Sequence, residues 1–252
     1  MTILLSVQNL SKQFGGLQAL TRLTFDLPEG QILALIGPNG AGNTTLFNVI
    51  NGVYRPEVGR IVFRDKDVTG MKSYGLARMG MARTHQIVRP LNELTVRENA
   101  MVGACFGREN HNLGHAAGIA DEVLRFVGLD SRANEMTSSL NVAQKKRLEL
   151  ARALASHPYL LLLDEVLAGL NLAEIDGMIE TVRKIREQGI TIIMIEHLMK
   201  AVMNVSDRVI VLNYGEQICD GTPHEIANDP RVIEAYLGDS SLANRLLQQE
   251  SV

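Results

Sequence analysis

The chain has 252 residues, of which 46% are hydrophobic and 21% charged, and its formal net charge is −3. This balance argues against a disordered charged tail and a polybasic nucleic-acid-binding surface, and the length suits one large α/β domain with a subdomain. No apolar run approaches the roughly 20 residues that span a bilayer, and the first residues lack the order of a signal peptide. We therefore expect a globular protein that stays in the cytoplasm and does not bind nucleic acid.

The first predicted elements are a pair of antiparallel strands. Apolar and polar residues alternate over residues 4–10 and again over residues 19–27, which is the period of a half-buried strand. Phe14-Gly15-Gly16 stands between the two segments and is typical of a turn. The start of the chain is therefore predicted to form an antiparallel β layer.

A strand, a glycine-rich loop and a helix follow in that order. Residues 31–36 are almost wholly apolar, as in a strand buried on both faces, and residues 44–52 suit a helix. The loop Gly37-Pro-Asn-Gly-Ala-Gly42-Asn43-Thr44 matches the motif G-x-x-x-x-G-K-[ST] except at the lysine. Backbone N–H groups of such a loop turn toward phosphates, and the positive end of the following helix adds to that field. The sequence therefore predicts an ATP phosphate site, with the Thr44 hydroxyl on Mg²⁺, at Gly37, Asn39, Gly40, Gly42, Asn43, Thr44 and Thr45.

Asn43 occupies the position of the motif's lysine. That lysine reaches the β and γ phosphates, whereas asparagine is shorter and neutral. We therefore expect weaker nucleotide binding and a larger loss of phosphoryl transfer, in which charge stabilisation dominates. The asparagine is either a natural loss of activity or a change introduced deliberately or by accident, and the retained acidic residues favour a change.

Residues 94–158 are mostly helical in pattern, with a stretch rich in Gly, His and Asn from Gly103 to Gly118. An inserted helical subdomain is predicted over 94–158. This leaves 1–93 and 159–225 for the core and the β layer, and 226–252 for a C-terminal helical tail. Two cysteines, Cys105 and Cys219, stand in no metal-binding spacing and are expected to be free thiols.

Two further apolar runs end in polar residues. Residues 159–163, predicted to form a buried strand, are followed by Asp164 and Glu165. Residues 190–195, predicted to form another, are followed by Glu196 and His197. Open α/β sheets place their ligands at the carboxyl ends of their strands. Asp164 is therefore predicted to hold Mg²⁺ through water, Glu165 to polarise the attacking water, and His197 to hold the γ-phosphate.

Gln86, in the sequence Ala-Arg-Thr-His-Gln, is predicted to contact both the metal and the water. Each of the three catalytic candidates also has an ordinary structural explanation. Glu165 suits a position beside a helix start, His197 a capping or surface histidine, and Gln86 a solvated loop amide. Their occurrence together at strand ends favours the catalytic interpretation.

From about residue 4 to residue 238, these motifs resemble the ATP-binding subunits of ABC transporters, above all those of branched-chain amino-acid importers. The likeness is carried by Phe14-Gly-Gly-Leu17, Leu94-Thr-Val-Arg-Glu-Asn99 and Leu162-Leu-Asp-Glu-Val-Leu-Ala-Gly-Leu-Asn171. The resemblance implies a P-loop NTPase (RecA-like) core with an N-terminal antiparallel β layer and an inserted helical subdomain. It also implies that residues 1–252 form a single ABC nucleotide-binding domain and an ABC-type ATPase that uses ATP and Mg²⁺.

The resemblance assigns further contacts. It makes Phe14 the aromatic that stacks on adenine, where a buried turn residue is the alternative, and residues 168–171 the loop that touches a partner across the ATP. The family's L-S-G-G-Q signature stands here as Leu-Asn-Val-Ala-Gln, so that Asn141, Ala143 and Gln144 would face the partner's γ-phosphate. Asn141 can still donate a hydrogen bond, but the Cβ of Ala143 stands where backbone normally approaches phosphate closely.

The resemblance also implies partners. Two ATP-binding domains of this family close head to tail, so a homologous subunit is expected, identical or distinct, whose closure on ATP drives transmembrane permease subunits. A periplasmic or extracellular solute-binding protein would act indirectly. Residues 87–94 are either the contact with the permease or a plain solvent-exposed loop. The chain is expected at the inner face of the cell membrane, as a peripheral protein on the cytoplasmic side.

Two functions stay open. One is an ATPase subunit that powers uptake of branched-chain or related amino acids, with hydrolysis impaired by Asn43. The other is a nucleotide-binding but non-hydrolysing structural or regulatory half of a heterodimer. A soluble ABC ATPase of DNA repair or translation is disfavoured, because the sequence has no coiled-coil insertion, tandem domain or basic face.

Overall fold

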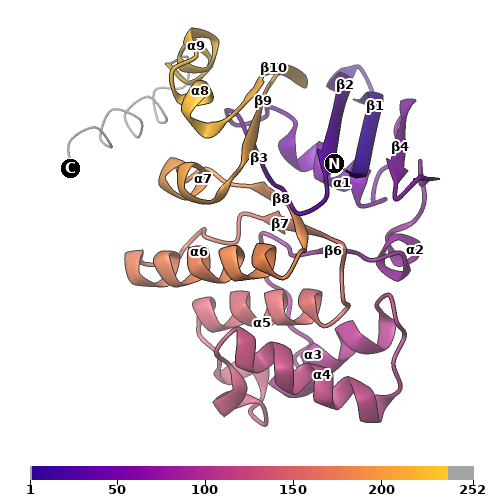
Figure 1. The fold of residues 1–252 in the computed structure, drawn as a ribbon, viewed down its shortest axis with the longest axis vertical. Coiled ribbons are helices and arrows are strands. Elements are labelled where there is room, and N and C mark those ends of the chain that lie inside the picture. The colour runs from indigo at the N-terminus through magenta and orange to yellow at the C-terminus, as the bar shows by residue number, and fades with distance from the viewer. Residues whose placement is uncertain (1, 238–252) are drawn as a thin grey trace. The chain divides into compact units, whose positions relative to one another are not determined.

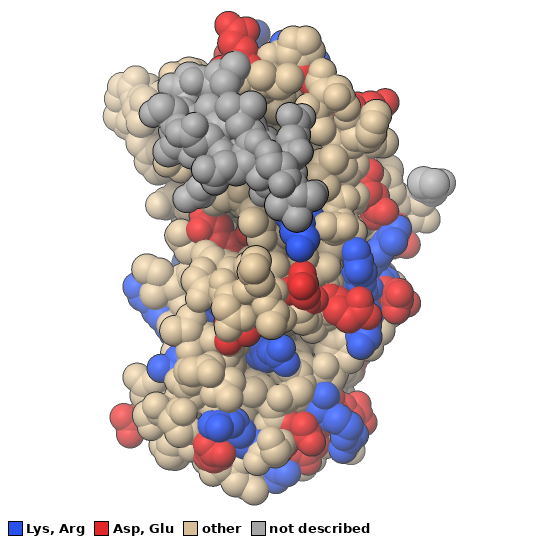
Figure 2. All heavy atoms as spheres, turned by 90° about the vertical axis from the view of Figure 1, so that its left-hand side faces the viewer, with Lys and Arg blue, Asp and Glu red and all other residues tan. Residues whose placement is uncertain are grey.

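The computed structural model describes residues 2–237, and its contacts divide the chain into two compact units (Figure 1). The first unit comprises the described parts of 1–71 and 191–252, and the second comprises 72–190. Within residues 2–237, no helix combines the length and the apolar character needed to cross a membrane. Basic and acidic side chains are intermingled on the face drawn in Figure 2.

The first unit begins with the predicted antiparallel layer. Strand β1 (Ile3–Phe14) pairs with β2 (Leu17–Pro28) on one side and β4 (Val58–Phe63) on the other, and β5 (Lys66–Asp67) follows β4. The pair predicted over residues 4–10 and 19–27 is confirmed, and both strands extend further. β1 continues through register shifts near Asn9, whose φ is 50°, because a bulge absorbs residues that break the alternation.

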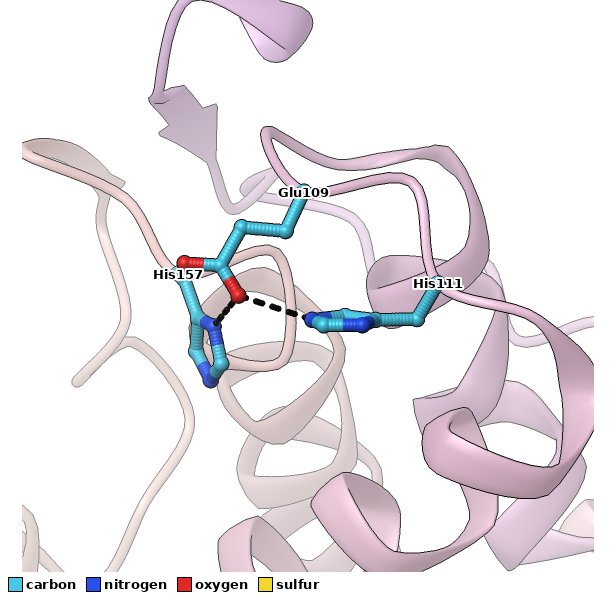
Figure 3. Close-up of side chains that lie close together, drawn as sticks. All are labelled: Glu109, His111 and His157. Atoms are coloured by element: carbon cyan, nitrogen blue, oxygen red, sulfur yellow. Dashed lines mark hydrogen bonds and ion pairs between the residues drawn. The ribbon is translucent and has the colours of Figure 1, made fainter.

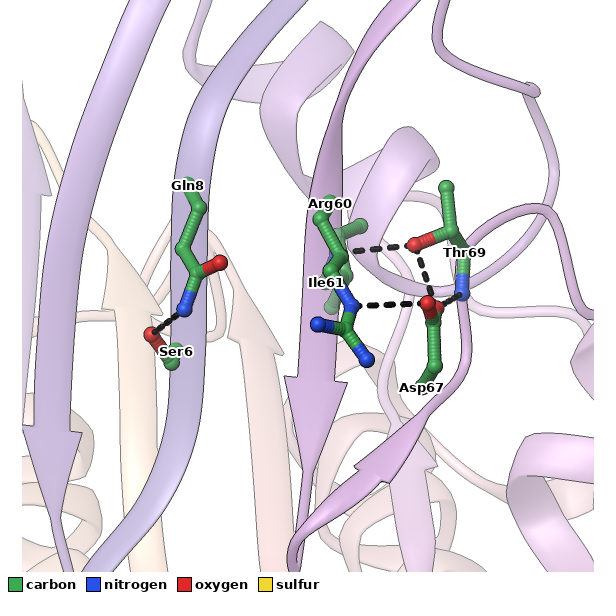
Figure 4. Close-up of polar contacts among 6 residues, drawn as sticks. All are labelled: Ser6, Gln8, Arg60, Ile61, Asp67 and Thr69. Atoms are coloured by element: carbon green, nitrogen blue, oxygen red, sulfur yellow. Dashed lines mark hydrogen bonds and ion pairs between the residues drawn. The ribbon is translucent and has the colours of Figure 1, made fainter.

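The turn after β4 is held mainly by side-chain hydrogen bonds, because the pairing of β4 with β5 covers only two residue pairs. Asp67 Oδ1 accepts hydrogen bonds from the backbone N–H and the hydroxyl of Thr69, and its Oδ2 accepts one from Arg60 Nε at 2.7 Å (Figure 4). Thr69 Oγ1 in turn accepts a hydrogen bond from the Ile61 N–H at 2.9 Å. The hydrogen bonds from Thr69, with a smaller effect of Arg60, lower the pKa of Asp67 to about 2, so these contacts are made by an ionised carboxylate at neutral pH.

A second group of strands in the first unit is mostly parallel. β3 (Ile32–Ile36) lies between β8 (Thr191–Ile195) and β9 (Arg208–Asn213), and β10 (Glu216–Gly221) pairs antiparallel with β9. Every residue of β3 and β8 is buried, which explains why their sequences are continuous apolar runs. The predicted strands 31–36 and 190–195 are thereby confirmed.

The helices of the first unit follow these strands. They are α1 (Asn43–Ile50) after β3, α7 (Met199–Val205) after β8, and α8 (Pro223–Ala227) and α9 (Pro230–Leu237) after β10. The helix predicted at 44–52 is therefore present as α1. The tail predicted over 226–252 is described only as far as residue 237, and the remainder lies outside the described residues.

The second unit contains the parallel strands β6 (Met81–Arg83) and β7 (Leu160–Asp164) with the flanking helices α2 (Ser73–Arg78) and α6 (Leu172–Glu187). Between the two strands lie α3 (Val96–Phe106), α4 (Leu113–Phe126), α5 (Val142–Leu154) and two short 3₁₀ turns, Asp130–Arg132 and Thr137–Ser139. The stretch 94–158 is thus helical, as the pattern predicted. The second unit is larger than the predicted subdomain because it also holds α2, β6, β7 and α6.

The predicted interruption from Gly103 to Gly118 is shorter than expected, since residues 107–112 alone lie outside α3 and α4. Gly103 belongs to α3, where a Cβ would collide with the carbonyl oxygen of Arg152 in α5. Glycine here permits close helix packing and does not break the helix. Asn112 caps α4 by accepting a hydrogen bond from the His115 N–H at 3.1 Å.

Candidate functional site

The phosphate loop connects β3 to α1 in the first unit. Gly37 has a φ of 158°, and a side chain there would collide with the backbone oxygen of Leu212. Gly42 has a φ of 110° and is the N-cap of α1, and its Cβ would lie 2.8 Å from the Ala19 oxygen. Glycine is therefore required at both ends of the loop by neighbouring backbone.

The loop is also fixed by backbone hydrogen bonds. The Gly215 N–H donates to the Ala41 oxygen at 2.9 Å, and the Thr21 N–H donates to the Gly215 oxygen at 2.8 Å. The first N–H groups of α1, which belong to Asn43, Thr44 and Thr45, have no acceptor within an α-helix. A pre-shaped loop that ends in unsatisfied N–H groups is suited to an anion such as a phosphate.

Asn43 is the first residue of α1 and is 7% exposed. Its Oδ1 is buried and accepts no hydrogen bond from the described residues. Burying such an acceptor unpaired costs about 1–3 kcal/mol. The amide oxygen therefore makes no structural bond that would account for asparagine at this position.

Phe14 stands at the end of β1 and is 41% exposed, which excludes the alternative of a buried turn residue. Its ring packs edge-on against Tyr54, with 5.0 Å between the centroids. Lys12 Nζ lies 4.9 Å from the Phe14 centroid and donates to Glu57 Oε1 at 2.6 Å. Tyr54 was not predicted, and the exposed aromatic pair is a surface on which a flat ring can stack.

His197 leaves the sheet at the same edge as the phosphate loop. Leu35 of β3 pairs with Ile195 of β8 in parallel register, and Gly37 and His197 each follow two residues later. His197 is partly buried. The sequence prediction that these groups share a strand-end edge is consistent with this register.

In the second unit, the structure brings together two of the predicted catalytic residues. Arg83 of β6 pairs with Leu162 of β7, and Gln86 and Glu165 each stand three positions further on. Gln86 Nε2 donates a hydrogen bond to Glu165 Oε2 at 2.7 Å. The amide therefore holds one carboxylate oxygen of Glu165 and orients the other.

Asp164 has a positive partner that sequence reasoning missed. Arg83 Nη2 lies 2.7 Å from Asp164 Oδ2, and the two side chains are 7% and 6% exposed. A buried carboxylate needs a positive charge beside it, and the sequence suggested that Mg²⁺ supplies this charge. Within the protein, Arg83 already supplies it. Strand β6, which supplies the arginine, has three residues, too few for a periodic pattern.

The backbone of Glu165 is in the left-handed region, with a φ of 48°. A non-glycine residue held there costs about 1–3 kcal/mol, so neighbouring bonds must maintain it. Lys146 is buried in α5 and donates from Nζ to the backbone carbonyl oxygen of Glu165 at 2.8 Å. The Ala168 N–H donates to the same carbonyl oxygen at 3.2 Å. Lys146 thus positions Glu165 and is a second residue that the sequence analysis did not single out.

The segment that carries Gln86 is anchored to α5 by a buried acid. Glu149 Oε1 accepts a hydrogen bond from the His85 N–H at 2.9 Å, and Arg152 Nη2 lies 3.7 Å from the same oxygen. Burial raises the pKa of Glu149 to about 7, although Arg152 and Lys146 oppose the shift. Burial and the nearby Arg83 lower the pKa of His85. The Glu149 carboxyl group therefore titrates near neutral pH.

The signature segment forms the start of α5. Asn141 is the N-cap, with its Oδ1 accepting from the Gln144 N–H at 2.9 Å, and Gln144 Oε1 accepts from the Asn141 N–H at 3.0 Å. The side chain of Asn141 thus stabilises the helix and leaves its Nδ2 as the available donor. Ala143 is 9% exposed and belongs to the core.

A cavity of about 830 Å³ lies beside the phosphate loop in the first unit. It is lined by loop residues 38–41, by the hairpin of β9 and β10, and by α9. Asn39 and Gly40 are the predicted site residues that face it. The cavity was not expected from the sequence, because it depends on how the residues after 213 pack against the loop.

Comparison with known proteins bears on the whole chain. The family described as "ABC transporter" matches residues 20–168, and the family described as "Branched-chain amino acid ATP-binding cassette transporter" matches residues 216–241. The high-affinity branched-chain amino acid transport ATP-binding protein LivG of Escherichia coli is 40% identical, over 94% of this chain and 98% of that protein. The corresponding protein BraF of Pseudomonas aeruginosa is 37% identical over the same shares.

Solved structures agree with these relatives. A nucleotide-free ATP-binding cassette from an ABC transporter is 30% identical with a TM-score of 0.85, over 94% of this chain and 100% of that one. The ADP conformation of an ATP-binding cassette is 29% identical with a TM-score of 0.84, over 95% and 100%. The mixed α/β fold is thus shared with solved ATP-binding cassettes, and sequence identity to the transport proteins extends over 94% of this chain. The chain belongs to the ABC transporter family of ATP-binding proteins and is by family an ABC-type ATPase.

Proposed function

We propose that this chain is the ATP-binding subunit of a membrane importer for branched-chain or related amino acids. The observation that carries the proposal is the hydrogen-bonded pair of Gln86 and Glu165, in a chain 40% identical to a branched-chain amino acid transport protein. A carboxylate oriented by an amide is the arrangement needed to position and polarise an attacking water.

The proposed roles follow the chemistry of each group. Glu165 polarises the water, Gln86 contacts the water and the metal, and His197 holds the γ-phosphate. Thr44 and Asp164 hold Mg²⁺, which prefers oxygen ligands and supplies positive charge against the phosphates when bound. Asp164 fits this role because Arg83 engages its Oδ2 and leaves Oδ1 as a further acceptor.

The remaining contacts concern the nucleotide and a second subunit. Phe14, with Tyr54 beside it, stacks on adenine, and the phosphate loop from Gly37 to Thr45 surrounds the phosphates. Asn141 donates from Nδ2 to the γ-phosphate bound by a homologous subunit, identical or distinct. The burial of Ala143 supports this contact, because a packed methyl group does not project from the helix start.

Asn43 impairs hydrolysis in the proposed enzyme. The asparagine cannot carry the positive charge that the motif's lysine places on the β and γ phosphates, and its buried Oδ1 presents a partial negative charge instead. Loss of one well-placed group of this kind costs about 10²–10³-fold in turnover. Binding falls less, because the loop N–H groups remain.

A second candidate function is a non-hydrolysing, nucleotide-binding half of a heterodimer. Asn43 favours it, and so do Asn141 and Ala143, which depart from the signature sequence of the family. In that case a distinct homologous subunit would supply the turnover. The intact Gln86–Glu165 pair supports the first candidate instead.

The proposed place of the subunit is the inner face of the cell membrane, bound to permease subunits. Residues 87–94 are the proposed contact, since Ile87 is 70% exposed and Leu91 is 42% exposed. Apolar side chains exposed on a loop next to the site suit a surface that is covered by a partner.

The proposal is tested by Mg-ATP binding and phosphate release for the chain and for Asn43→Lys, each alone and mixed with a candidate partner subunit. Asn43→Met is the matched control, because methionine restores the length of the side chain without its charge. We expect Asn43→Lys to raise turnover by about 100-fold and Asn43→Met to leave it near the starting value.

A further variant separates the two candidates. Glu165→Gln added to Asn43→Lys should abolish turnover and keep ATP binding, because the amide cannot polarise water. If Asn43→Lys binds ATP but does not hydrolyse it, even with the partner, the non-hydrolysing function is correct. If neither form binds ATP, both functions are wrong.

A further inference from the structure

Outside the nucleotide site, three side chains converge in the second unit. Glu109 and His111 lie in the segment between α3 and α4, and His157 lies between α5 and β7 (Figure 3). Glu109 Oε2 is 2.8 Å from His111 Nε2 and 2.9 Å from His157 Nδ1. One potential ligand atom from each residue lies within 4.8 Å of the others.

The spacing is close to that of a metal centre. Zinc bonds of about 2.0–2.1 Å to nitrogen and oxygen at tetrahedral angles place ligand atoms about 3.3 Å apart. Glu109 Oε2 would therefore move away from each imidazole nitrogen by about 0.5 Å. The two imidazole nitrogens lie within 4.8 Å of each other and would approach by up to about 1.5 Å, so binding an ion requires rotation of the histidine side chains. Each histidine presents a ring nitrogen toward the same carboxylate oxygen in Figure 3.

The backbone segments that carry the ligands are held together by other contacts. A Cβ at Gly107 would lie 2.5 Å from Ser156, so glycine allows the two segments to touch. The Arg108 N–H donates to the Ser156 oxygen at 3.2 Å, and the Arg108 guanidinium lies 4.2 Å from the centroid of the Tyr159 ring. The backbone segments that carry the ligands are thus held together by the fold itself, which lowers the ordering cost of binding an ion.

Glu109 is the charged group of the cluster, and its surroundings favour the ionised form that a metal ligand requires. Bonds from His157, Arg108 and His111 hold the pKa of Glu109 at about 2, so this group is ionised at neutral pH. Arg108 Nη2 contacts Oε1 at 2.5 Å and leaves Oε2 for the two histidines. The guanidinium orients the carboxylate, but its charge opposes a cation, so the expected affinity is moderate.

We propose that Glu109, His111 and His157 form a binding site for a divalent transition metal ion of the zinc type. Two imidazole nitrogens and one carboxylate oxygen are a ligand set that favours Zn²⁺ over Mg²⁺ or Ca²⁺, and the fourth position is open to water. The ion links the segment after α3 to the connection before β7. The site is separate from the proposed ATP-binding residues and does not depend on nucleotide.

The test uses the full chain without a histidine tag, stripped with a chelator and free of nucleotide. Zn²⁺ is titrated in competition with a chromophoric chelator, and Co²⁺ is titrated with visible absorption recorded. We expect one equivalent of each ion, with Co²⁺ bands of four-coordinate geometry and no thiolate charge-transfer band from Cys105 or Cys219. His111→Ala and His157→Ala should each weaken binding by about 100-fold or more, because each removes a ligand.

His224→Ala is the matched control, since this exposed histidine lies in α8 of the first unit, and it should bind zinc like the unchanged chain. Zinc should also raise the melting temperature of the unchanged chain and of the control. It should not raise that of the double variant His111→Ala/His157→Ala, whose fold is checked by circular dichroism. The inference is overturned if the unchanged chain takes up no zinc, or if His111→Ala/His157→Ala binds it as tightly as the control. Neither result bears on ATP turnover, which is measured separately.

Discussion

Arg83 supplies the positive charge that stabilises the buried carboxylate of Asp164 at the end of β7. Its guanidinium lies 2.7 Å from Asp164 Oδ2 in a buried environment. We expect Arg83→Met to lower the free energy of unfolding by about 3–5 kcal/mol, because it leaves a buried carboxylate without its cation. Urea denaturation measures this. Arg60→Met is the control, since it breaks the solvent-exposed pair with Asp67 and should shift the midpoint little. Equal effects of the two variants would contradict the assigned role of Arg83.

Glu149 makes stability depend on pH near neutrality. Its folded-state pKa of about 7 lies above the ordinary value of 4.5, so the folded state favours the protonated acid. Its unfavourable contribution is therefore absent below about pH 4.5, grows as pH rises and is complete above about pH 7. The carboxyl group is surrounded by Arg152, Lys146, Asp164 and the His85 N–H. Burial raises the pKa of Glu149 more than Arg152, the His85 N–H and Lys146 lower it, and Asp164 adds to the increase.

Glu149→Gln removes this titration and keeps an acceptor for the His85 N–H. At pH 8 the variant should be more stable than the unchanged chain by about 1–2 kcal/mol, and the difference should vanish near pH 4.5. Unfolding curves at several pH values for both chains provide the measurement. A difference that stays constant with pH would show that Glu149 does not carry the shift.

Two helical glycines have opposite expected effects. In α3, Gly103 faces the carbonyl oxygen of Arg152, whereas Gly118 in α4 has nothing within 4 Å of an added Cβ. We expect Gly103→Ala to destabilise the fold by about 1–3 kcal/mol, because α3 and α5 must separate. Gly118→Ala should stabilise it by about 0.5–1 kcal/mol through helix propensity. Thermal unfolding of the two variants should therefore move in opposite directions, and a loss of stability in both would disprove the packing role of Gly103.

Elements with long or strict patterns were predictable, and short ones were not. β3 and β8 are continuous apolar runs whose residues are all buried, so their sequences alone indicated strands. β6 has three residues and is held in place by pairing with β7. The sequence analysis did not predict β6 and therefore did not identify Arg83 as the partner of Asp164.

The chain as a whole should associate through ATP if the proposed function is correct. Asn43→Lys restores the phosphate charge and Glu165→Gln blocks hydrolysis, so the double variant should trap a closed pair with ATP between two subunits. Light scattering after gel filtration should show a doubled mass with ATP, on its own or after mixing with a homologous partner. Glu165→Gln alone is the control and should remain monomeric, because Asn43 weakens ATP binding. The absence of association in every mixture would contradict the proposed pairing.

Local sequence was sufficient for the phosphate loop, its departure at Asn43, the strand-end acids and the helical region, because each depends on neighbouring residues and on a short period. The Arg83–Asp164 pair joins residues 81 positions apart, and the contact between Glu109 and His157 joins residues 48 positions apart. Such contacts have no signature in a single sequence, since folding alone brings the partners together. The strained backbone of Glu165, the support from Lys146 and the raised pKa of Glu149 likewise arise from burial and packing, which only the tertiary structure decides.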